Sequence, residues 1–464
     1  MTSLWWIRRD LRLTDNAALQ ASLEADSVIP IFILDPAFDS ASARRKEFLY
    51  EGLHALDKEL RECGSYLVIR NGKPIDVLRQ LLSETGATKI YAEEDFTPYA
   101  RKRDNKIEYH LPLHLVSGQT VHHPNSVLKA DGKPYTVYTP YSKAWKAKLS
   151  AKTDLLPAPE KINTPFAIPS EPLPRYKVSP LFVAGAREAL VRLEEFLFKR
   201  IYSYDEDRNR MDLDGTSSLS PYLRFGMLGL RQAVSAAQQA MLEARGGASK
   251  KSAGIWLNEL IWREFYIQIL YHFPYVSKTA FNPALANIPW RNNESEFEAW
   301  KAGRTGVPVI DAAMRQLKEI GWMHNRARMI VASYLVKDLL IDWRWGEAWF
   351  MENLLDGDPA ANNGGWQWTA GTGTDAAPYF RIFNPVLQSA RFDPHGDYIR
   401  KWIPELRGVD AQDIHAPWEK GIKVKGYPEK PIMERNKDRT MQAYQQSKTI
   451  GSKSAESHTH YSPA

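Results

Sequence analysis

Hydrophobic positions in the first part of the chain follow two alternating patterns. Short runs rich in β-branched and aromatic residues predict strands, and apolar positions at helical spacing between them predict helices. The predicted strands are 3–7, 28–35, 66–70 and 89–92, and the predicted helices are 48–63 and 74–86. Strands that alternate with helices form parallel sheets with right-handed crossovers, so we predict a doubly wound α/β domain over residues 1–130.

The later part of the chain has helical periodicity alone, most clearly at 255–271, 309–320 and 325–340. We therefore predict a larger all-helical domain over residues 187–446. The segment 131–186 is rich in Pro, Lys and Ser, which is typical of an inter-domain linker. Residues 447–464 are polar and low in aromatics, and we expect a disordered tail there.

Composition narrows the class of protein. The 464 residues are 44% hydrophobic and 25% charged without a long apolar run, so we expect a soluble protein that spans no membrane. The N-terminal sequence MTSLWWIRRDLRL has the wrong order of charge and apolar residues for a secretory signal. Cys63 is the only cysteine, which excludes a disulfide framework and a thiolate cluster for zinc or iron–sulfur, and we expect no metal site. The net charge of +6 favours a polyanionic partner, although a solvated basic surface explains it equally well.

One predicted helix combines apolar and charged residues in an unusual way. Residues 255–271, IWLNELIWREFYIQILY, are apolar almost all round and should be buried, yet they include Glu259, Arg263 and Glu264. Buried charges need a partner or a ligand. Glu259 and Arg263 are spaced to pair on one helix face, or both line a cavity walled by Trp256 and Trp262.

Two segments further along also carry polar residues among apolar ones. In GWMHNRARM, residues 321–329, Trp322, Asn325 and Met329 fall on one helical stripe, and His324 lies off it in what we interpret as a structural position. Residues 356–368, DGDPAANNGGWQW, combine acids, amides, glycines and tryptophans. We interpret this segment as ligand-binding rather than as an ordinary helical turn, since glycines permit close backbone approach.

A third segment is short and rich in hydroxyl groups. Residues 215–220, GTSSLS, offer side-chain hydroxyls and backbone N–H groups to phosphate oxygens. A turn that only caps the following helix is the competing interpretation.

These motifs, with TGVPVIDAAMRQL and the continuation TAGTGTDAAPYFRIFNP, resemble the photolyase/cryptochrome family, specifically the class I cyclobutane pyrimidine dimer photolyases. The resemblance extends from residue 5 to about 418. It implies an α/β domain that binds an antenna chromophore, joined to a helical domain that binds FAD. It also implies a carbon–carbon lyase that repairs cyclobutane pyrimidine dimers in DNA by transferring an electron from light-excited, reduced FAD to the flipped-out lesion.

The resemblance assigns roles residue by residue. The expected FAD-binding residues are Tyr204, Thr216, Ser217, Ser218, Leu219, Ser220, Arg263, Trp322, Arg328, Asp356, Gly357, Asp358 and Asn362, the last facing flavin N5. The expected lesion-pocket residues, taken as catalytic, are Glu259, Trp262, Asn325, Met329 and Trp368. DNA contacts are expected from the lesion-pocket residues other than Met329, and also from Arg208, Arg326 and Gln388. The expected electron relay is Trp290, Trp343 and Trp366.

A few positions distinguish the branches of the family. Members that repair (6–4) photoproducts have histidines where this chain has Asn325 and Met329, and plant and animal cryptochromes have Asp or Cys where it has Asn362. We therefore expect dimer repair, with a cryptochrome-like blue-light receptor as the alternative. Some relatives have Arg where this chain has Ser218. Another residue must therefore neutralise one negative charge of the FAD phosphates. A flavin oxidoreductase is disfavoured because the turn IRRDLRLTDN lacks GxGxxG.

The antenna chromophore is predicted from two segments of the first domain. Residues 43–49, ARRKEFL, and 96–104, FTPYARKRD, resemble members with a deazaflavin or flavin antenna more than folate members, and an empty site is the alternative. Folate members have Asn-Glu where this chain has Pro98 and Tyr99. We expect dimer-containing DNA as partner, no obligate protein partner, and a bacterial-type cytoplasmic protein associated with the nucleoid through DNA.

Overall fold

The computed structural model describes residues 1–177 and 181–458, with side chains described up to residue 449. The chain forms two compact units. The first comprises residues 1–205, 216–272 and 355–357, and the second comprises 206–215, 273–354 and the chain from 358 onward. The chain therefore passes between the units more than once. The predicted helical domain is divided between them, because helices up to residue 272 pack with the α/β part.

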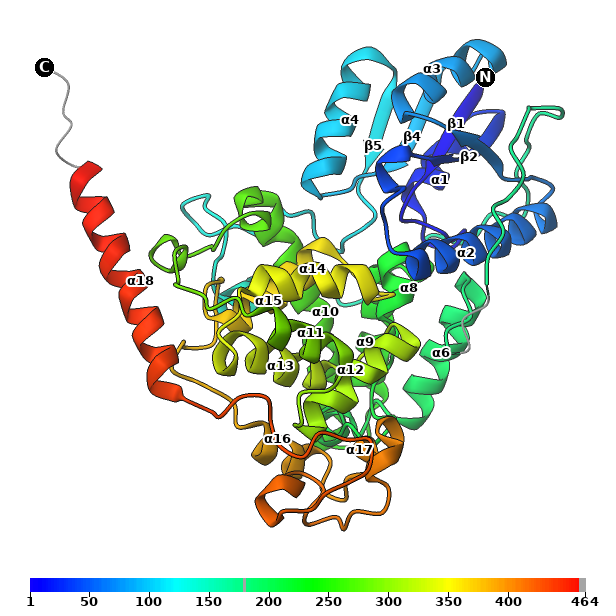
Figure 1. Ribbon diagram of the computed structural model, residues 1–464. Coiled ribbons are helices and arrows are strands. Elements are labelled where there is room, and N and C mark those ends of the chain that lie inside the picture. The colour runs from blue at the N-terminus through cyan, green and yellow to red at the C-terminus, as the bar shows by residue number, and fades with distance from the viewer. Residues whose placement is uncertain (178–180, 459–464) are drawn as a thin grey trace, which may run out of the picture. The chain divides into compact units, whose positions relative to one another are not determined.

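The first unit contains a five-stranded parallel sheet with strand order β3-β2-β1-β4-β5, drawn in blue and cyan in Figure 1. The strands are β1 (Thr2–Ile7), β2 (Ser27–Leu34), β3 (Val68–Asn71), β4 (Lys89–Glu93) and β5 (Leu113–Val116). The predicted parallel α/β fold is confirmed. Strand β5 was missed by the sequence pattern because it is a short edge strand whose His114 is exposed.

Both faces of the sheet are covered, as a doubly wound fold requires. Leu4, Trp6 and Ile31 share one face and pack with residues of α3 and α4 in one hydrophobic cluster. Ser3 points to the other face, where its hydroxyl donates to the carbonyl of Ser22 at the end of α1. The helices of this part are α1 (Ala17–Ser22), α2 (Ala43–Glu62), α3 (Pro74–Thr85) and α4 (Pro98–His110), with the 3-10 turn η1 (Pro36–Phe38).

The rest of the first unit is helical. Its helices are α5 (Tyr138–Lys148), α6 (Ala186–Lys199), α8 (Ser220–Phe225), α9 (Leu230–Glu243) and α10 (Gly247–His272), and the short α7 (Tyr204–Asp207) begins in it. Helix α10 packs against α9 and α5. The predicted linker is therefore not without structure, since α5 lies within residues 131–186 and is fixed to α10 by side-chain contacts.

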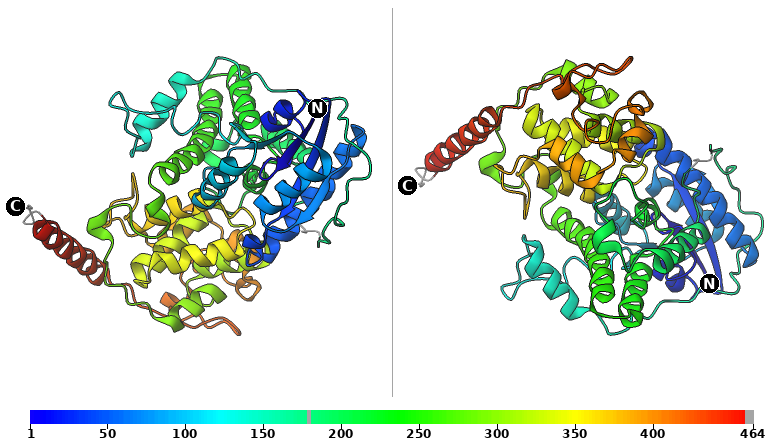
Figure 2. Two further views of the ribbon diagram at one scale, coloured as in Figure 1. Left: turned by 90° about the horizontal axis from the view of Figure 1, so that it is seen from above. Right: turned by 90° about the horizontal axis from the view of Figure 1, so that it is seen from below.

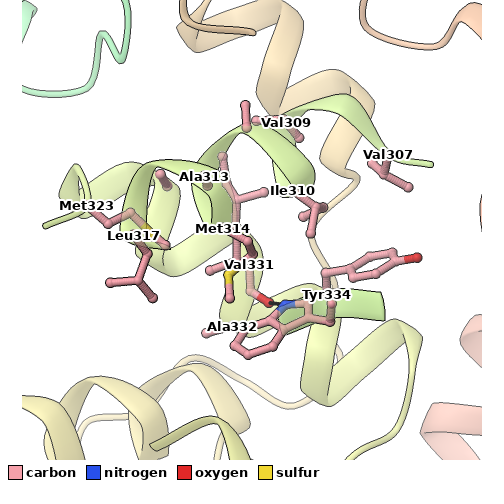
Figure 3. Packing of buried hydrophobic residues seen from close by; sticks show 14 of the residues in the cluster. Val307, Val309, Ile310, Ala313, Met314, Leu317, Met323, Val331, Ala332 and Tyr334 are labelled. Atoms are coloured by element: carbon pink, nitrogen blue, oxygen red, sulfur yellow. Dashed lines mark hydrogen bonds between the residues drawn. The ribbon is translucent and has the colours of Figure 1, made fainter. Parts of the chain in front are cut away.

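The second unit is a helical assembly around one large hydrophobic core. Its helices are α11 (Glu294–Ala302), α12 (Pro308–Ile320), α13 (Asn325–Ser333), α14 (Trp343–Asn353), α15 (Pro359–Ala370), α16 (Pro385–Phe392), α17 (Asp397–Trp402) and α18 (Lys437–His458). The short turns are η2 (Pro274–Ser277), η3 (Pro283–Leu285), the π-helical η4 (Tyr334–Asp338), η5 (Pro404–Leu406) and η6 (Pro417–Lys420). Figure 3 shows the core at α12, where Ile310, Met314 and Leu317 lie near Val331. Within residues 1–177 and 181–458, no helix combines the length and apolar character needed to cross a membrane.

Two segments differ from their predicted structure. Most of 356–368 is helix α15, because Asp358 caps it by accepting from the N–H groups of Ala360 and Ala361, and Pro359 fits its first turn. Residues 447–458, predicted as tail, continue helix α18, which runs outward in Figure 2. The buried Tyr444 and the bond from Ser447 to the carbonyl of Ala284 hold the first part of α18 against the unit. Residues 459–464 lie outside the described part of the chain.

Gly226 ends helix α8 at a point of close backbone approach. Its φ is +66°, which favours glycine, and a Cβ there would overlap the carbonyl oxygen of Arg9. Gly86 ends α3 with the same φ of +66° but has nothing within 4 Å of an added Cβ. The two glycines therefore share a backbone conformation and differ in surrounding space.

We predict that Gly226→Ala lowers the free energy of unfolding by about 3 kcal/mol or more, since both backbone strain and overlap act there. The matched variant Gly86→Ala should cost about 1–2 kcal/mol from backbone strain alone. Denaturant unfolding of both variants measures the difference. Equal losses would contradict the proposed steric role of the Arg9 contact.

Candidate functional site

The residues predicted to form the site are distributed over both units. The first unit holds Tyr204, Thr216, Ser217, Ser218, Leu219, Ser220, Glu259, Trp262, Arg263, Asp356 and Gly357. The second unit holds Arg208, Trp290, Trp322, Asn325, Arg326, Arg328, Met329, Trp343, Asp358, Asn362, Trp366, Trp368 and Gln388. Within each unit, the structure brings together residues that are far apart in the sequence.

In the first unit, helix α8, which follows the hydroxyl-rich turn, is hydrogen-bonded to the separate segment 355–357. Ser218 has a φ of +50°, a conformation that few non-glycine residues adopt, and its hydroxyl lies 3.4 Å from that of Thr216. Arg224 of α8 donates to the carbonyl of Gly357 over 2.7 Å. The side chain of Arg224 therefore connects the turn region to Asp356 and Gly357.

Helix α10 carries three of the predicted residues of the first unit. Arg263 donates to the carbonyl of Leu223 in α8 over 3.4 Å, and Glu259 is half-buried. Trp262 is also half-buried and stacks on Tyr138. Trp256, predicted as a cavity wall, is instead a core residue packed against Phe196, with ring centroids 5.0 Å apart.

Glu264, the third charged residue of the segment 255–271 in α10, has a structural role. It is buried, and its carboxylate accepts from the indole Nε1 of Trp145 over 2.5 Å and from the backbone N–H groups of Val121 and His122. Burial raises the pKa of Glu264 to about 7, and these three donors oppose the rise. The buried acid therefore fixes α5 and the preceding loop to α10.

In the second unit, His324 caps the N-terminus of α13. Its Nδ1 accepts from the N–H of Arg326 over 3.1 Å, and its side chain is buried. Burial lowers the pKa of His324 to about 4, with Arg326 and Arg328 adding to the effect. The interpretation of His324 as a structural residue is consistent with this contact. Trp322 precedes the helix, so the predicted stripe is limited to Asn325 and Met329, one turn apart on α13.

Three arginines gather beside the start of α13. Arg326 donates to Oδ1 of Asn209 over 2.5 Å and lies 4.4 Å above the ring of Phe392. Burial, with a further contribution from the neighbouring cations Arg208 and Arg391, lowers the pKa of Arg326 to about 10. Such crowding of like charges favours an anionic ligand.

Arg391 lies on α16 beside Phe392, and no local sequence pattern distinguishes it from other surface arginines. Gln388 lies on the same helix, one turn before Phe392.

Helix α15 presents an amide in a fixed orientation. The Nδ2 of Asn362 donates to the carbonyl of Glu347 over 3.0 Å, which leaves Oδ1 to accept a hydrogen bond. The next residue, Asn363, donates to Oε1 of Glu347 over 3.0 Å. Burial raises the pKa of Glu347 to about 7, and the Asn363 bond opposes this rise.

The two tryptophans of α15 face different ways, because a separation of two residues places them on different sides of a helix. Trp366 is buried and contacts Phe350 and Trp300 at ring-centroid distances of 5.0 and 6.3 Å. A Cβ on Gly346 would overlap the Trp366 ring, so α14 and α15 pack closely there. Trp368 is half-buried.

The other two residues of the predicted electron relay also belong to the second unit. Trp343 is buried at the start of α14, and Trp290 lies with its ring centroid 6.0 Å from that of Tyr444.

Comparison with known proteins identifies the family. A model described as DNA photolyase matches residues 3–161, and one described as the FAD binding domain of DNA photolyase matches 256–448. The deoxyribodipyrimidine photo-lyase of Synechococcus sp. is 40% identical over 93% of this chain and 94% of its own length. The chain belongs to the DNA photolyase family.

Other photolyases agree over nearly the whole length. The deoxyribodipyrimidine photo-lyase of Escherichia coli is 38% identical over 96% of this chain and 98% of its own. A crystal structure of a bacterial class III photolyase from Agrobacterium tumefaciens superposes with a TM-score of 0.91 at 35% identity, covering 97% and 98% of the two chains. An archaeal photolyase from Sulfolobus tokodaii, solved with two FAD molecules, gives 0.82 at 33% identity, covering 97% and 100%.

The second unit fits the flavin that the family model names. Nε1 of Trp366 is a buried donor with no hydrogen-bond partner among the described residues, and Oδ1 of Asn362 is an oriented acceptor. Both are groups that a polar heterocycle would satisfy. The photolyase family's cofactor therefore agrees with the hydrogen-bonding groups of α15.

We predict that His324 makes the fold less stable in acid. Its folded pKa of about 4 lies below the ordinary 6.5, so the unfolded chain binds the extra proton and stability falls as pH drops from about 6.5 toward 4. His324→Asn keeps an N-cap without titrating. Between pH 7 and pH 5, the free energy of unfolding of this variant should fall by about 2 kcal/mol less than that of the wild type. Denaturant titrations at the two pH values measure the difference. An unchanged pH dependence would show that His324 is not the group responsible.

Proposed function

We propose that this chain repairs cyclobutane pyrimidine dimers in DNA by light-driven electron transfer from reduced FAD to a flipped-out lesion. The observation that carries the proposal is the surface of α13, where Asn325 and Met329 lie one turn apart with Arg326 beside them. An amide and a thioether suit an uncharged pyrimidine pair, and the guanidinium suits the neighbouring phosphate. The 40% identity to a deoxyribodipyrimidine photo-lyase supports the same reaction.

FAD is assigned to the residues that the family motifs mark for it. We assign binding of the phosphates and ribityl chain to the hydroxyl-rich turn, and contacts with the rest of the cofactor to the other residues of the set. The set is Tyr204, Thr216, Ser217, Ser218, Leu219, Ser220, Arg263, Trp322, Arg328, Asp356, Gly357, Asp358 and Asn362. When bound, the reduced flavin supplies the electron that opens the cyclobutane ring and takes it back afterward. Oδ1 of Asn362, whose amide is fixed by the bond to Glu347, would accept from the N5–H that reduced flavin carries.

The lesion is to be bound by stacking and by a few hydrogen bonds. Enzymes that act on bases within a duplex extrude them, and a damaged pair is cheaper to extrude than a sound one. Trp262 and Trp368 are both half-buried and offer ring faces, each worth about 1–3 kcal/mol per stacked base. Glu259 is assigned to the pyrimidine edge, and Asn325 and Met329 are assigned further contacts with the lesion.

DNA docking is assigned to the arginines beside α13. Arg208, Arg326 and Arg391 concentrate positive charge, and Gln388 lies on the same helix as Arg391. Phosphate contacts of this kind hold the duplex without reading its sequence. DNA as substrate would place the enzyme with the nucleoid, in the cytoplasm.

The tryptophans Trp290, Trp343 and Trp366 are assigned to the relay that returns an oxidised flavin to its reduced form. With an oxidised flavin bound, Trp366 would donate an electron to it, and Trp343 and then Trp290 would supply the electron that Trp366 has lost. The burial of Trp366 and Trp343 supports the inner positions, since indole rings shielded from water are suited to pass charge without side reactions.

A second chromophore of flavin or deazaflavin type is assigned to the first unit. The sheet order reverses between β1 and β4, and α/β sheets bind ligands at the carboxyl ends of strands beside such a point. There, Arg8 and Arg103 each lie 4.7 Å from the ring of Trp6, and Tyr99 donates to Asp35 over 2.5 Å. The Sulfolobus photolyase with two FAD molecules supports a flavin.

The test of the proposed function is repair of a defined lesion. Chemically reduced protein, incubated with an oligonucleotide that carries one cyclobutane dimer, should restore the thymines under blue light and not in the dark. An oligonucleotide with a (6–4) lesion is the matched control and should stay unrepaired. Binding without repair in the light would favour a photoreceptor, and repair of the (6–4) lesion alone would overturn the assigned lesion class.

A separate prediction concerns the docking arginines. Arg326→Ala should weaken binding to dimer-containing DNA alike for all flanking sequences, and it should lower the salt slope by about 1, because one phosphate contact is lost. Arg407→Ala, an exposed arginine of the same unit, is the control and should leave both quantities unchanged. Binding isotherms at several salt concentrations measure the slope. A loss confined to some flanking sequences would show that Arg326 reads bases.

A further inference from the structure

One lesion-pocket tryptophan is stacked on a residue that has no assigned role. The rings of Trp262 on α10 and Tyr138, the first residue of α5, lie face to face with centroids 3.6 Å apart and planes 4° apart. Both residues belong to the first unit. Tyr138 lies in the segment that the sequence pattern assigned to the linker, so nothing local connects it to the site.

The stacked tyrosine is held rigidly. Its hydroxyl donates to the carbonyl of Asn258 over 2.9 Å, one turn before Trp262 on α10. Lys146 of α5 donates to Oδ1 of the same Asn258 over 2.6 Å, and Trp145 donates to the buried Glu264. These bonds tie α5 to α10 near both of its ends, and the hydroxyl bond holds the Tyr138 ring against Trp262.

The stack restricts the indole ring and leaves part of it exposed. Phe265 meets Trp262 edge-on at 5.5 Å, and Tyr266 lies tilted at 5.6 Å. Trp262 nevertheless remains half-buried, so part of its ring surface is open. An indole pressed against a fixed phenol ring loses its freedom to rotate, and its open surface is then presented in one orientation.

Core packing alone accounts poorly for this arrangement. Tyr141, one turn later on α5, is a core residue with 2% exposure and also packs on Phe265, at 5.3 Å. Tyr138 is only half-buried, and its neighbour Val137 is 45% exposed. The Tyr138–Trp262 stack thus lies at the border of the unit, where a ring pair contributes less to the core and more to a binding surface.

We propose that Tyr138 is a positioning residue for lesion recognition, which fixes the plane of Trp262 so that the open surface of the indole stacks on the flipped dimer. The proposal rests on the proposed function, since it takes Trp262 as part of the lesion pocket. Tyr138 acts through Trp262 and makes no contact of its own with the lesion. Pre-orienting a stacking partner lowers the entropy lost on binding, so the effect falls on damaged DNA and spares undamaged DNA.

The test is a double-mutant cycle with Tyr138→Leu and Trp262→Ala, read as affinity for dimer-containing and undamaged oligonucleotides. Tyr138→Leu should weaken dimer binding about tenfold and leave undamaged binding within about twofold, because only stacking is lost. Tyr138→Phe loses the hydroxyl bond but keeps the stacked ring, so its dimer affinity should stay much closer to wild type than that of Tyr138→Leu. In the Trp262→Ala background, Tyr138→Leu should have no further effect, because its target is absent.

Several outcomes overturn the proposal. If Tyr138→Leu binds dimers as tightly as wild type, the stack is only structural. If Tyr138→Leu still weakens dimer binding in the Trp262→Ala background, Tyr138 contacts the lesion directly. Tyr135→Ala, whose ring packs on Tyr141 at 6.3 Å in the same segment, is the matched control and should bind dimers normally. A loss in this control equal to that of Tyr138→Leu would mean that the segment acts through folding.

Two further measurements distinguish an effect of the substitution on folding from an effect on lesion binding. FAD content and the midpoint of thermal unfolding should match wild type in Tyr138→Leu. If that variant fails to fold, Tyr138→His keeps a smaller planar ring, and its dimer affinity should fall below wild type; an unchanged value overturns the proposal. If the wild-type protein neither binds nor repairs dimers, the proposed function fails, and the role of Tyr138 fails with it.

Discussion

The first unit depends on the burial of one carboxylate. Glu264 lies in a helix that is apolar on nearly all sides, and an ionised acid there is stable only if donors surround it. Three donors do so, from Trp145 and from the backbone at Val121 and His122. Because these donors come from outside α10, satisfying the acid fixes the position of α5 and of the loop before it.

That fixed pair of helices explains how an aromatic surface is kept in place. Trp262 is two residues before Glu264 on α10, and Tyr138 is seven residues before Trp145 on α5. The bond between Trp145 and Glu264 therefore holds the two elements that bring the stacked rings together. A polar interaction inside the unit thus supports a partly exposed aromatic stack at its border.

The second unit uses the same principle with different groups. Glu347 accepts from Asn363 through its carboxylate and from Asn362 through its backbone, so one residue of α14 orients two amides of α15. Gly346, its neighbour, allows the ring of Trp366 to lie against α14. The oriented amide, the buried indole and the crowded arginines of α13 and α16 are each fixed by packing before any ligand arrives, which is the preorganisation that photochemical repair and DNA docking require.

The parallel sheet, the helices with the clearest periodicity, the residue types assigned to the site and, through its motifs, the photolyase family could be predicted from the sequence. These features depend on local periodicity, on capping and on short motifs, which are readable along the chain. Even α15 carried its signals, Asp358 and Pro359 at its start and Gly371 at its end, but its dense mixture of polar and aromatic residues resembled a binding loop. Only the tertiary structure decided that Glu264 is structural, that Arg391 joins Arg326, and that Tyr138 stacks on Trp262. Those facts depend on contacts between residues far apart in sequence, whose energies come from shared burial and leave no trace in any one segment.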